Sequence, residues 1–235
     1  MKCWVSLLLA LFAQTTAEVA ITAEPHHHLV FANDQVRVFS VEVPPHSATL
    51  MHRHAHDYFY VTLGPADISN EVAGQPAAEL KLSDGEVRFS PGPFAHLVRT
   101  STQPFRNVTV ELLQDAKLRH APAHWDAAHP DEDRGLNILH GGTQEILFVK
   151  DGVRASEFEL QVGGVLPPVR HPHLLIAVSD VALMATEQGH GGMPSYVPGE
   201  AQLKSGDSRW LPAADSQSMT NVGTKPARFV TLEFP

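Results

Sequence analysis

Histidines are the residues in this sequence whose type and spacing could bind a metal. The chain has 15 histidines among 235 residues, and the stretch 52–56 (HRHAH) holds three of them. Alternate side chains of a β-strand share one face, so a strand through this stretch would direct its imidazoles to one side. Neutral imidazole is a good ligand for Zn, Fe, Mn, Cu or Ni. The stretch therefore predicts a metal site, with the solvated face of an edge strand as the alternative.

A third ligand has to come from another part of the chain. His96 follows Pro91-Gly92-Pro93 and lies on or near a later strand that could fold back against the first. Eight further histidines are not expected to be ligands. We interpret 26–28 (HHH) as a mobile, adventitious cation binder, and the rest as solvated surface or turn residues, namely His120, His124, His129, His140 and His190.

The two halves of the chain resemble each other, which indicates a duplicated domain. The matching segments are 52–54 with 171–173, 82–91 with 203–212, and 104–112 with 226–234. They run in the same order at an almost constant separation of about 120 residues, which chance matches would not do.

The elements that must position these residues are predicted to be short β-strands. Runs of β-branched and aromatic residues are separated by Gly, Pro, Asn and Asp, without sustained helical periods. The expected strands include 35–43, 59–63, 78–82, 86–89 and 108–113 in the first copy, and 156–162, 174–178, 208–211 and 228–234 in the second. The pattern predicts an all-β protein of antiparallel sandwiches or barrels. We expect the domains at 24–115 and 136–235, joined by a linker at 116–135.

The first 17 residues have the composition of a secretory signal. Lys2 precedes the apolar run 4–13, and small and polar residues end at Ala17. The run is shorter than the ~20 residues that a membrane-spanning helix needs. Cleavage after residues 1–17 would remove Cys3, the single cysteine, so we expect a secreted or periplasmic protein without disulfides, thiolate sites or membrane contact. The net charge of −9 argues against nucleic acid as a partner.

The two histidine-bearing segments of the first copy resemble the motifs of the cupin superfamily, G-x5-H-x-H-x3,4-E-x6-G and G-x5-P-x-G-x2-H-x3-N. Gly85, Pro91 and His96 match the second motif at the family spacing. The first motif is matched by His52 and His54, and by Gly64 one residue early. Three residues depart from the two motifs. His46 and Pro93 stand at glycine positions, and Thr100 stands at the asparagine position. The resemblance covers nearly all of 23–235 and implies a bicupin, which consists of two tandem jelly-roll β-barrels.

The resemblance implies that His52, His54 and His96 hold a divalent metal ion. The family's fourth ligand, a glutamate, falls by spacing on Tyr58 or beside it on Asp57. Asp57 is therefore a possible fourth ligand, and His56 is another if the strand bulges.

The second copy departs further from the family pattern. His171 and His173 keep the positions of the first motif, but Gln217 stands where the second-motif histidine belongs. Two ligands without a third rarely hold a metal, so we expect this copy to be a structural or pocket-closing partner.

The expected function is that of a metal-dependent cupin enzyme acting on a small organic molecule, with Fe(II) and dioxygenase chemistry favoured over Zn, Mn, Ni or Cu. Three neutral ligands leave open positions and uncompensated positive charge on the ion. Tyr58 and Tyr60 are the candidate catalytic residues, orienting the substrate or donating protons. The alternatives are a Zn- or Mn-dependent isomerase or lyase, a non-catalytic binding protein, and a purely structural pair of barrels; a homo-oligomer is compatible with each.

Arg88 and Arg209 occupy equivalent positions in the two copies, as do Glu111 and Glu233. Arginines that point into the barrels could bind a carboxylate substrate, whereas outward ones would only aid solubility. Their presence in the copy with the incomplete motif favours a structural role.

Overall fold

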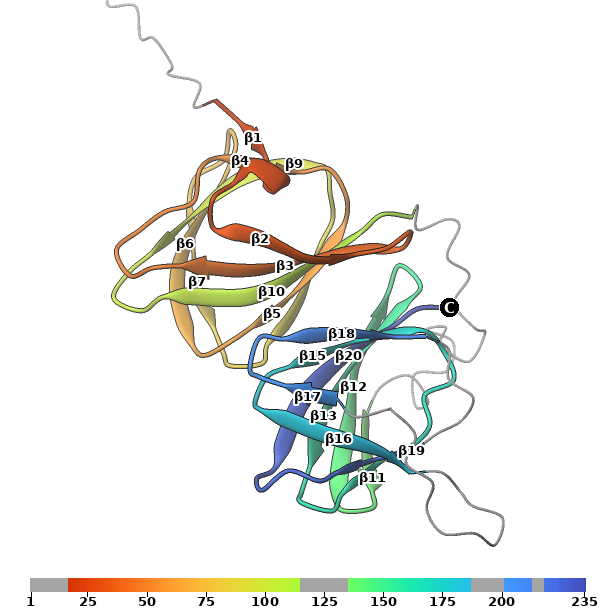
Figure 1. Ribbon diagram of the computed structural model, residues 1–235. Helices are drawn as coiled ribbons and strands as arrows, with labels where there is room; N and C mark the ends of the chain where they lie inside the picture. Colours follow the sequence, from red (N-terminus) through yellow and green to blue (C-terminus); the bar gives the residue numbers. More distant parts are fainter. Residues whose placement is uncertain (1–16, 115–134, 187–200, 213–217) are drawn as a thin grey trace, which may run out of the picture.

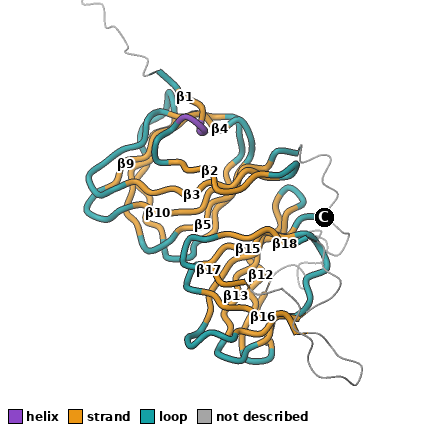
Figure 2. Tube along the Cα trace, in the orientation of Figure 1, coloured by secondary structure: helices purple, strands orange, loops and turns teal. Residues whose placement is uncertain are grey.

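The chain, seen in a computed structural model, folds almost entirely into β-strands. Residues 17–114, 135–186, 201–212 and 218–235 are described; the expected signal at 1–16 and nearly all of the expected linker lie outside them. The described residues form twenty strands in four sheets and one short helix, η1 (Ile21–Ala23) (Figures 1 and 2). That helix cannot span a membrane, because it has a single turn. The predicted all-β fold class is confirmed.

The first barrel consists of two five-stranded sheets. One has the order β1 (Val19–Ala20), β4 (His52–His54), β9 (Phe94–Thr100), β6 (Ala66–Val72) and β7 (Ala78–Leu82). The other has the order β2 (His27–Ala32), β3 (Val36–Val43), β10 (Phe105–Leu112), β5 (Tyr58–Thr62) and β8 (Val87–Ser90). The pairs are antiparallel except for β1 with β4, which is parallel.

The second barrel repeats this plan with a six-stranded and a four-stranded sheet. The larger has the order β11 (Gly135–Leu139), β12 (Gly142–Lys150), β13 (Val153–Leu160), β20 (Ala227–Glu233), β15 (His173–Ala177) and β18 (Ser208–Leu211). The smaller has the order β14 (Val165–Leu166), β19 (Ser218–Asn221), β16 (Val181–Thr186) and β17 (Ala201–Leu203).

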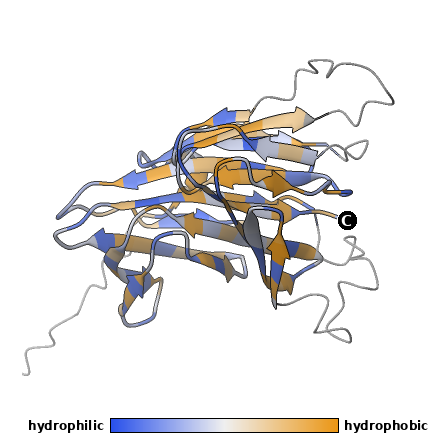
Figure 3. Cartoon of the chain, turned by 90° about the horizontal axis from the view of Figure 1, so that it is seen from below, coloured by the Kyte–Doolittle hydropathy of each residue, from blue (hydrophilic) through white to orange (hydrophobic). Residues whose placement is uncertain are grey.

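Alternation of apolar and polar residues explains why strands such as β3 form. In its sequence VRVFSVEV, Val36 and Val38 are fully buried toward one side, while Arg37 between them is half-buried. Phe39 is also fully buried, because it faces the interior of its own barrel. The sheet is therefore covered on both faces, and Figure 3 shows hydrophobic residues concentrated along the strands.

The two barrels share one apolar core. Val38, Phe59 and Val110 of the first barrel belong to the same buried cluster as Leu174 and Leu232 of the second. This cluster joins the β2-β3-β10-β5-β8 sheet to the six-stranded sheet of the other barrel, and Figure 1 shows the two barrels stacked in this way. The other sheet of the first barrel, which contains β4 and β9, lies away from that contact.

One local expectation is wrong. A single strand through 52–56 would place residues 52, 54 and 56 on one face, but the structure ends β4 at His54 and begins β5 at Tyr58 in the other sheet. Residues 55–57 form the connection between the sheets. The break is stabilised by Asp57, whose carboxylate accepts a hydrogen bond from the Gly92 N–H at 2.8 Å.

Candidate metal centre

Strands β4 and β9 bring together the three histidines that the sequence predicts. His52 lies directly opposite His96 in the antiparallel register, and His54 follows on the same face of β4. The ring centroids of His52 and His96 are 4.5 Å apart, and His54 lies 5.2 Å from His52 and 5.1 Å from His96. His52 and His54 are 0% and 1% exposed, which rules out the solvated edge-strand interpretation.

A fourth histidine, His27, joins this cluster from the opposite sheet. One ligand atom of each of His27, His52 and His54 lies within 4.8 Å of the others, and the rings of His27 and His52 are 4.6 Å apart. The His27 side chain is 6% exposed and belongs to β2. The interpretation of 26–28 as a mobile, adventitious cation binder is therefore wrong for His27. We call His27, His52, His54 and His96 the histidine cluster.

Three rings of the histidine cluster are held through Nδ1. The contacts are His52 Nδ1 to Leu50 O at 2.9 Å, His96 Nδ1 to Asn70 Oδ1 at 2.7 Å, and His27 Nδ1 to Glu24 Oε2 at 2.6 Å. Each partner atom is an acceptor, so Nδ1 carries the proton and Nε2 keeps its lone pair for a metal. Nε2 of His52 and of His96 is buried without a hydrogen-bond partner among the described residues, as unfilled ligand positions would be.

His54 is oriented by a buried carboxylate and an aromatic ring. Its Nδ1 lies 3.6 Å from Glu111 Oε1, and Glu111 Oε2 lies 2.7 Å from Arg37 Nη2. Tyr58 stacks on His54 with ring centroids 3.9 Å apart. Arg37 balances the charge of the buried Glu111, so His54 need not be protonated to offset it.

Burial keeps three of the rings in the neutral form that binds metals. It lowers the pKa of His52 to about 4, and the pKa values of His54 and His96 are also lowered. Burial alone would raise the pKa of Glu24, but hydrogen bonds from His27, His26 and the Leu50 N–H lower it to about 2. At neutral pH His52, His54 and His96 are therefore neutral imidazoles, and Glu24 and Glu111 beside the cluster are ionised.

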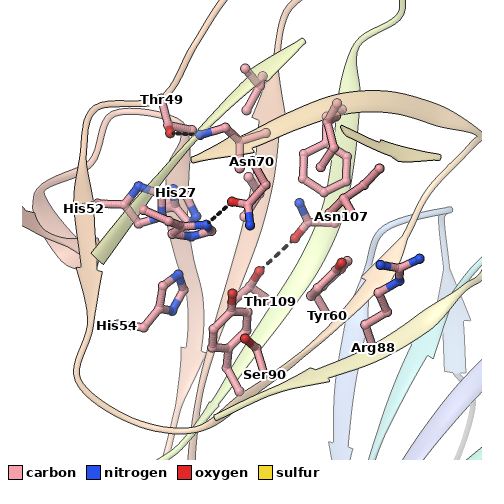
Figure 4. A pocket seen from close by; sticks show the side chains of 18 of the residues that line it. His27, Thr49, His52, His54, Tyr60, Asn70, Arg88, Ser90, Asn107 and Thr109 are labelled. Atoms are coloured by element: carbon pink, nitrogen blue, oxygen red, sulfur yellow. Dashed lines mark hydrogen bonds between the residues drawn. The ribbon is translucent and has the colours of Figure 1, made fainter. Parts of the chain in front are cut away.

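The histidine cluster opens into a cavity of about 250 Å³ inside the first barrel, seen in Figure 4. Tyr58 and Tyr60 line it, together with Asn107, Thr109 and several apolar side chains. Burial raises the pKa of both tyrosines, so each hydroxyl keeps its proton at neutral pH. Among the described lining residues there is no Asp or Glu, so the tyrosines are available as proton donors and no carboxylate is available as a base.

The two possible fourth ligands named from the sequence lie elsewhere. Asp57 binds the Gly92 backbone, and His56 is half-buried in the connection between β4 and β5. Neither lines the cavity. The structure brings His27 to the cluster from the other sheet, although no sequence motif points to it.

Comparisons with known proteins agree with this architecture. No family model and no curated protein matches the sequence. Among solved structures, the Lactobacillus farciminis oxalate decarboxylase formate complex has a TM-score of 0.58 at 14% identity, over 86% of this chain and 77% of that one. Oxalate decarboxylase from Bacillus subtilis at pH 4.6 has a TM-score of 0.57 at 13% identity, and the match covers 85% of this chain and 68% of that one. AerE from Microcystis aeruginosa has a TM-score of 0.56 at 9% identity, and the match covers 90% of this chain and 98% of that one.

The chain has the bicupin fold. These identities establish the fold alone, and they confirm the resemblance to cupins and the two jelly-roll barrels inferred from the motifs. The cupin fold and the histidine cluster together support binding of a divalent metal in the first barrel.

The second barrel keeps only part of the corresponding site. In β13 and β20, Arg154 pairs with Glu233 as Arg37 pairs with Glu111 in β3 and β10, with Arg154 Nη2 2.8 Å from Glu233 Oε2. His173 lies opposite Glu233, just as Tyr58 lies opposite Glu111 in the first barrel. His173 therefore occupies the position that corresponds to Tyr58.

The remaining positions of the second barrel offer fewer metal ligands. In the first barrel, His27 lies opposite Val41. The equivalent position of the second barrel, opposite Phe158, is occupied by Gln144 of β12. Gln217 lies outside the described residues. In the parts of the chain that the structure describes, His27, His52 and His54 are the one group of ligands whose atoms all lie close enough together for a metal, and the ring of His96 adjoins them.

Proposed function

We propose that this bicupin is a metal-dependent enzyme that acts on a small organic molecule, with Fe(II) and dioxygenase chemistry as the favoured combination. The observation that carries the proposal is the histidine cluster: His27, His52 and His54 bring ligand atoms within 4.8 Å of one another from two sheets, and the ring of His96 lies 4.5 Å from that of His52. The Nε2 atoms of His52 and His96 are buried without hydrogen-bond partners among the described residues. The adjoining cavity is smaller than the roughly 300–1,000 Å³ of drug-sized ligand sites, so it suits a small substrate.

The ligand set determines what the centre can do. A divalent ion bound there supplies a Lewis acid, and a redox partner if it is iron, with its positive charge uncompensated by its ligands. The chain's own residues hold the rings, line the cavity mainly with apolar side chains, and present two protonated tyrosines. Tyr58 packs on His54, and Tyr60 lies further along the cavity, so each can donate a hydrogen bond to a bound substrate.

A Zn- or Mn-dependent lyase or isomerase is the second candidate. It is supported by the oxalate decarboxylases among the structures of similar fold. The protonated tyrosines also fit this candidate, because lyase and isomerase reactions need a proton to be delivered.

Elemental analysis of untagged full-length protein, followed by oxygen-uptake assays on phenolic and diketone substrates, tests the proposal. The proposal expects about one metal per chain, its loss in His54→Ala, and oxygen uptake that depends on iron. Turnover without oxygen uptake would favour the lyase or isomerase. Bound metal without any turnover would leave a binding protein, and absence of metal after reconstitution with each of these ions would overturn the metal centre.

We also propose that the protein is exported, as the composition of residues 1–17 suggests. Support comes from Glu18, the first residue of the expected mature chain, whose carboxylate binds the Arg53 guanidinium. Glu18 therefore contacts the first barrel at the position that directly follows the expected cleavage site. N-terminal sequencing of protein from the culture medium or periplasm tests this proposal: a chain that begins at Glu18 is expected, and retention of Met1 would contradict it.

A further inference from the structure

Arg88 lies at the end of the cavity opposite the histidine cluster. It is on β8, directly opposite Tyr60 of β5, and Figure 4 shows it on the far side of Tyr60 and Asn107 from His54. Among the described residues that line the cavity, it is the one with a permanent charge. The cavity thus has a metal-binding end and a cationic end.

The guanidinium of Arg88 is positioned to bind an anion. Its Nε donates to Glu86 Oε1 at 2.7 Å, and its side chain also hydrogen-bonds Tyr60, so the donors left for a ligand are the remaining N–H groups of its two Nη atoms. Its side chain is 36% exposed, which makes it accessible from solvent. A guanidinium presents a planar fork that matches a carboxylate, and such charge-assisted bonds are stronger than neutral ones.

The wall between the two ends is mainly apolar. Val41, Val43, Ile68, Val98 and Phe105 line the cavity and belong to the core of the first barrel, with Leu80 packed against them. A ligand that reached from Arg88 to the histidine cluster would place its middle against these side chains. A purely polar ligand would lose hydrogen bonds to water there without replacing them.

We propose that the substrate is a small carboxylate with an apolar body, whose carboxylate binds Arg88 and whose other end presents oxygen donors to the histidine cluster. This inference rests on the proposed metal centre for the second contact, but the contact with Arg88 needs no metal. It assigns to Arg88 a role in substrate recognition, in place of the structural role that its repetition in Arg209 suggests.

Calorimetric titration of the full chain with two matched probes tests the inference. The probes are 3,4-dihydroxybenzoate and 3,4-dihydroxybenzamide, which have nearly the same shape and differ in charge. Zinc-loaded protein is used, because zinc is redox-inert and no oxidation accompanies binding. The acid is expected to bind more than about 10-fold tighter than the amide, and Arg88→Met to remove that preference.

Two further variants test whether the preference for the acid depends on the shape of the Arg88 guanidinium and on its place in the cavity, beyond its positive charge. Arg88→Lys keeps the charge without the fork, and is expected to retain only part of the preference for the acid. Arg99→Met removes an exposed arginine that pairs with Glu71 outside the cavity, and is expected to leave both affinities unchanged. Elemental analysis should show the same zinc content in every variant.

The possible results distinguish this inference from the proposed function. Equal affinity for acid and amide in the wild type, no binding of either, or a preference that survives Arg88→Met would overturn the carboxylate site. If the wild type does not take up metal, the same titrations are performed on the metal-free chain. An Arg88-dependent preference there would support the carboxylate contact and overturn the metal centre, whereas its absence would overturn both.

Discussion

The acceptors behind His27, His52 and His96 decide which nitrogen of each ring faces the cavity. Glu24 is the most heavily used, since it accepts from the rings of His27 and His26 and from the backbone N–H groups of His26 and Leu50. It is also buried, at 2% exposed. Glu24 therefore ties the N-terminal segment to the barrel and fixes the direction of His27 Nε2.

Replacing Glu24 should weaken metal binding without removing a ligand. Glu24→Gln is expected to reduce zinc affinity by about 10- to 100-fold, the usual effect of losing a carboxylate behind a metal-binding histidine. Competition with a chromophoric chelator measures the affinity. Glu18→Gln is the control, because Glu18 pairs with Arg53 on the surface and should leave the affinity unchanged. Equal affinities for all three proteins would show that Glu24 does not position His27.

The buried histidines should also make the metal-free protein sensitive to acid. The pKa of His52 is about 4 in the folded chain against 6.5 when unperturbed, so the unfolded chain binds more protons between these values. The free energy of unfolding therefore falls as the pH drops from 6.5 to 4, by about 3 kcal/mol for His52 alone. Urea unfolding at several pH values measures it, with His52→Gln showing a weaker dependence. A flat profile between pH 6.5 and 4 in the wild type would contradict the burial of a neutral ring.

Spacing along the chain predicts three members of the histidine cluster but not the fourth. His52, His54 and His96 lie in motifs whose spacing reflects one pair of neighbouring strands. His27 comes from the opposite sheet, and a run of three histidines near an expected cleavage site resembles a surface tag. The signal in the sequence that could have identified it is Glu24, a carboxylate three residues earlier that binds its Nδ1.

At the level of elements, the strands were predictable and their breaks were not. Expected strands 78–82 and 208–211 coincide with β7 and β18, because alternation and flanking turn residues define both ends. The break between β4 and β5 depends on a hydrogen bond from Gly92, which lies 35 residues from Asp57. The pattern of residues around 52–58 carries no information on a hydrogen bond to a residue so distant in the sequence.

The turn between β7 and β8 joins the barrels and should be intolerant of a side chain. Gly85 has a φ of +77°, and a Cβ there would overlap the Arg228 guanidinium, which binds Asp84 across the barrel contact. Gly85→Ala is expected to lower the free energy of unfolding by about 2–4 kcal/mol, since it combines backbone strain with displacement of Arg228.

Gly74 provides the matched control for this turn. It has a φ of +78°, and a Cβ added there would have nothing within 4 Å, so Gly74→Ala isolates the backbone strain, about 1 kcal/mol. Chemical denaturation of both variants makes the comparison. Equal losses of stability would contradict a role for the Arg228 contact.

For the molecule as a whole, the shared core makes the two barrels one cooperative unit. Leu232 of the second barrel is fully buried in the cluster that also contains Phe59 and Val110 of the first. The internal repeat predicted two similar domains, but it could not predict which sheets would face each other. That choice follows from β5, β10, β15 and β20, which are buried on both faces.

Weakening the second barrel should therefore destabilise the first. Leu232→Ala is expected to lower the stability of the whole chain by about 2–5 kcal/mol, with release of metal and loss of strand structure in one transition. Circular dichroism and metal release, followed together during denaturation, measure this. Ile138→Ala, at a position 78% exposed, should change neither. Separate transitions for the two signals would show that the barrels fold independently.

Zinc affinity across a set of single-histidine variants tests the central claim most directly. His27→Ala, His52→Ala, His54→Ala and His96→Ala are each expected to weaken zinc binding by more than about 100-fold, because each removes a ligand. His56→Ala, which removes a histidine outside the cavity, should stay within about twofold of the wild type. If His56→Ala were as harmful as the others, or if none of the four weakened binding, the histidine cluster would not be the metal centre.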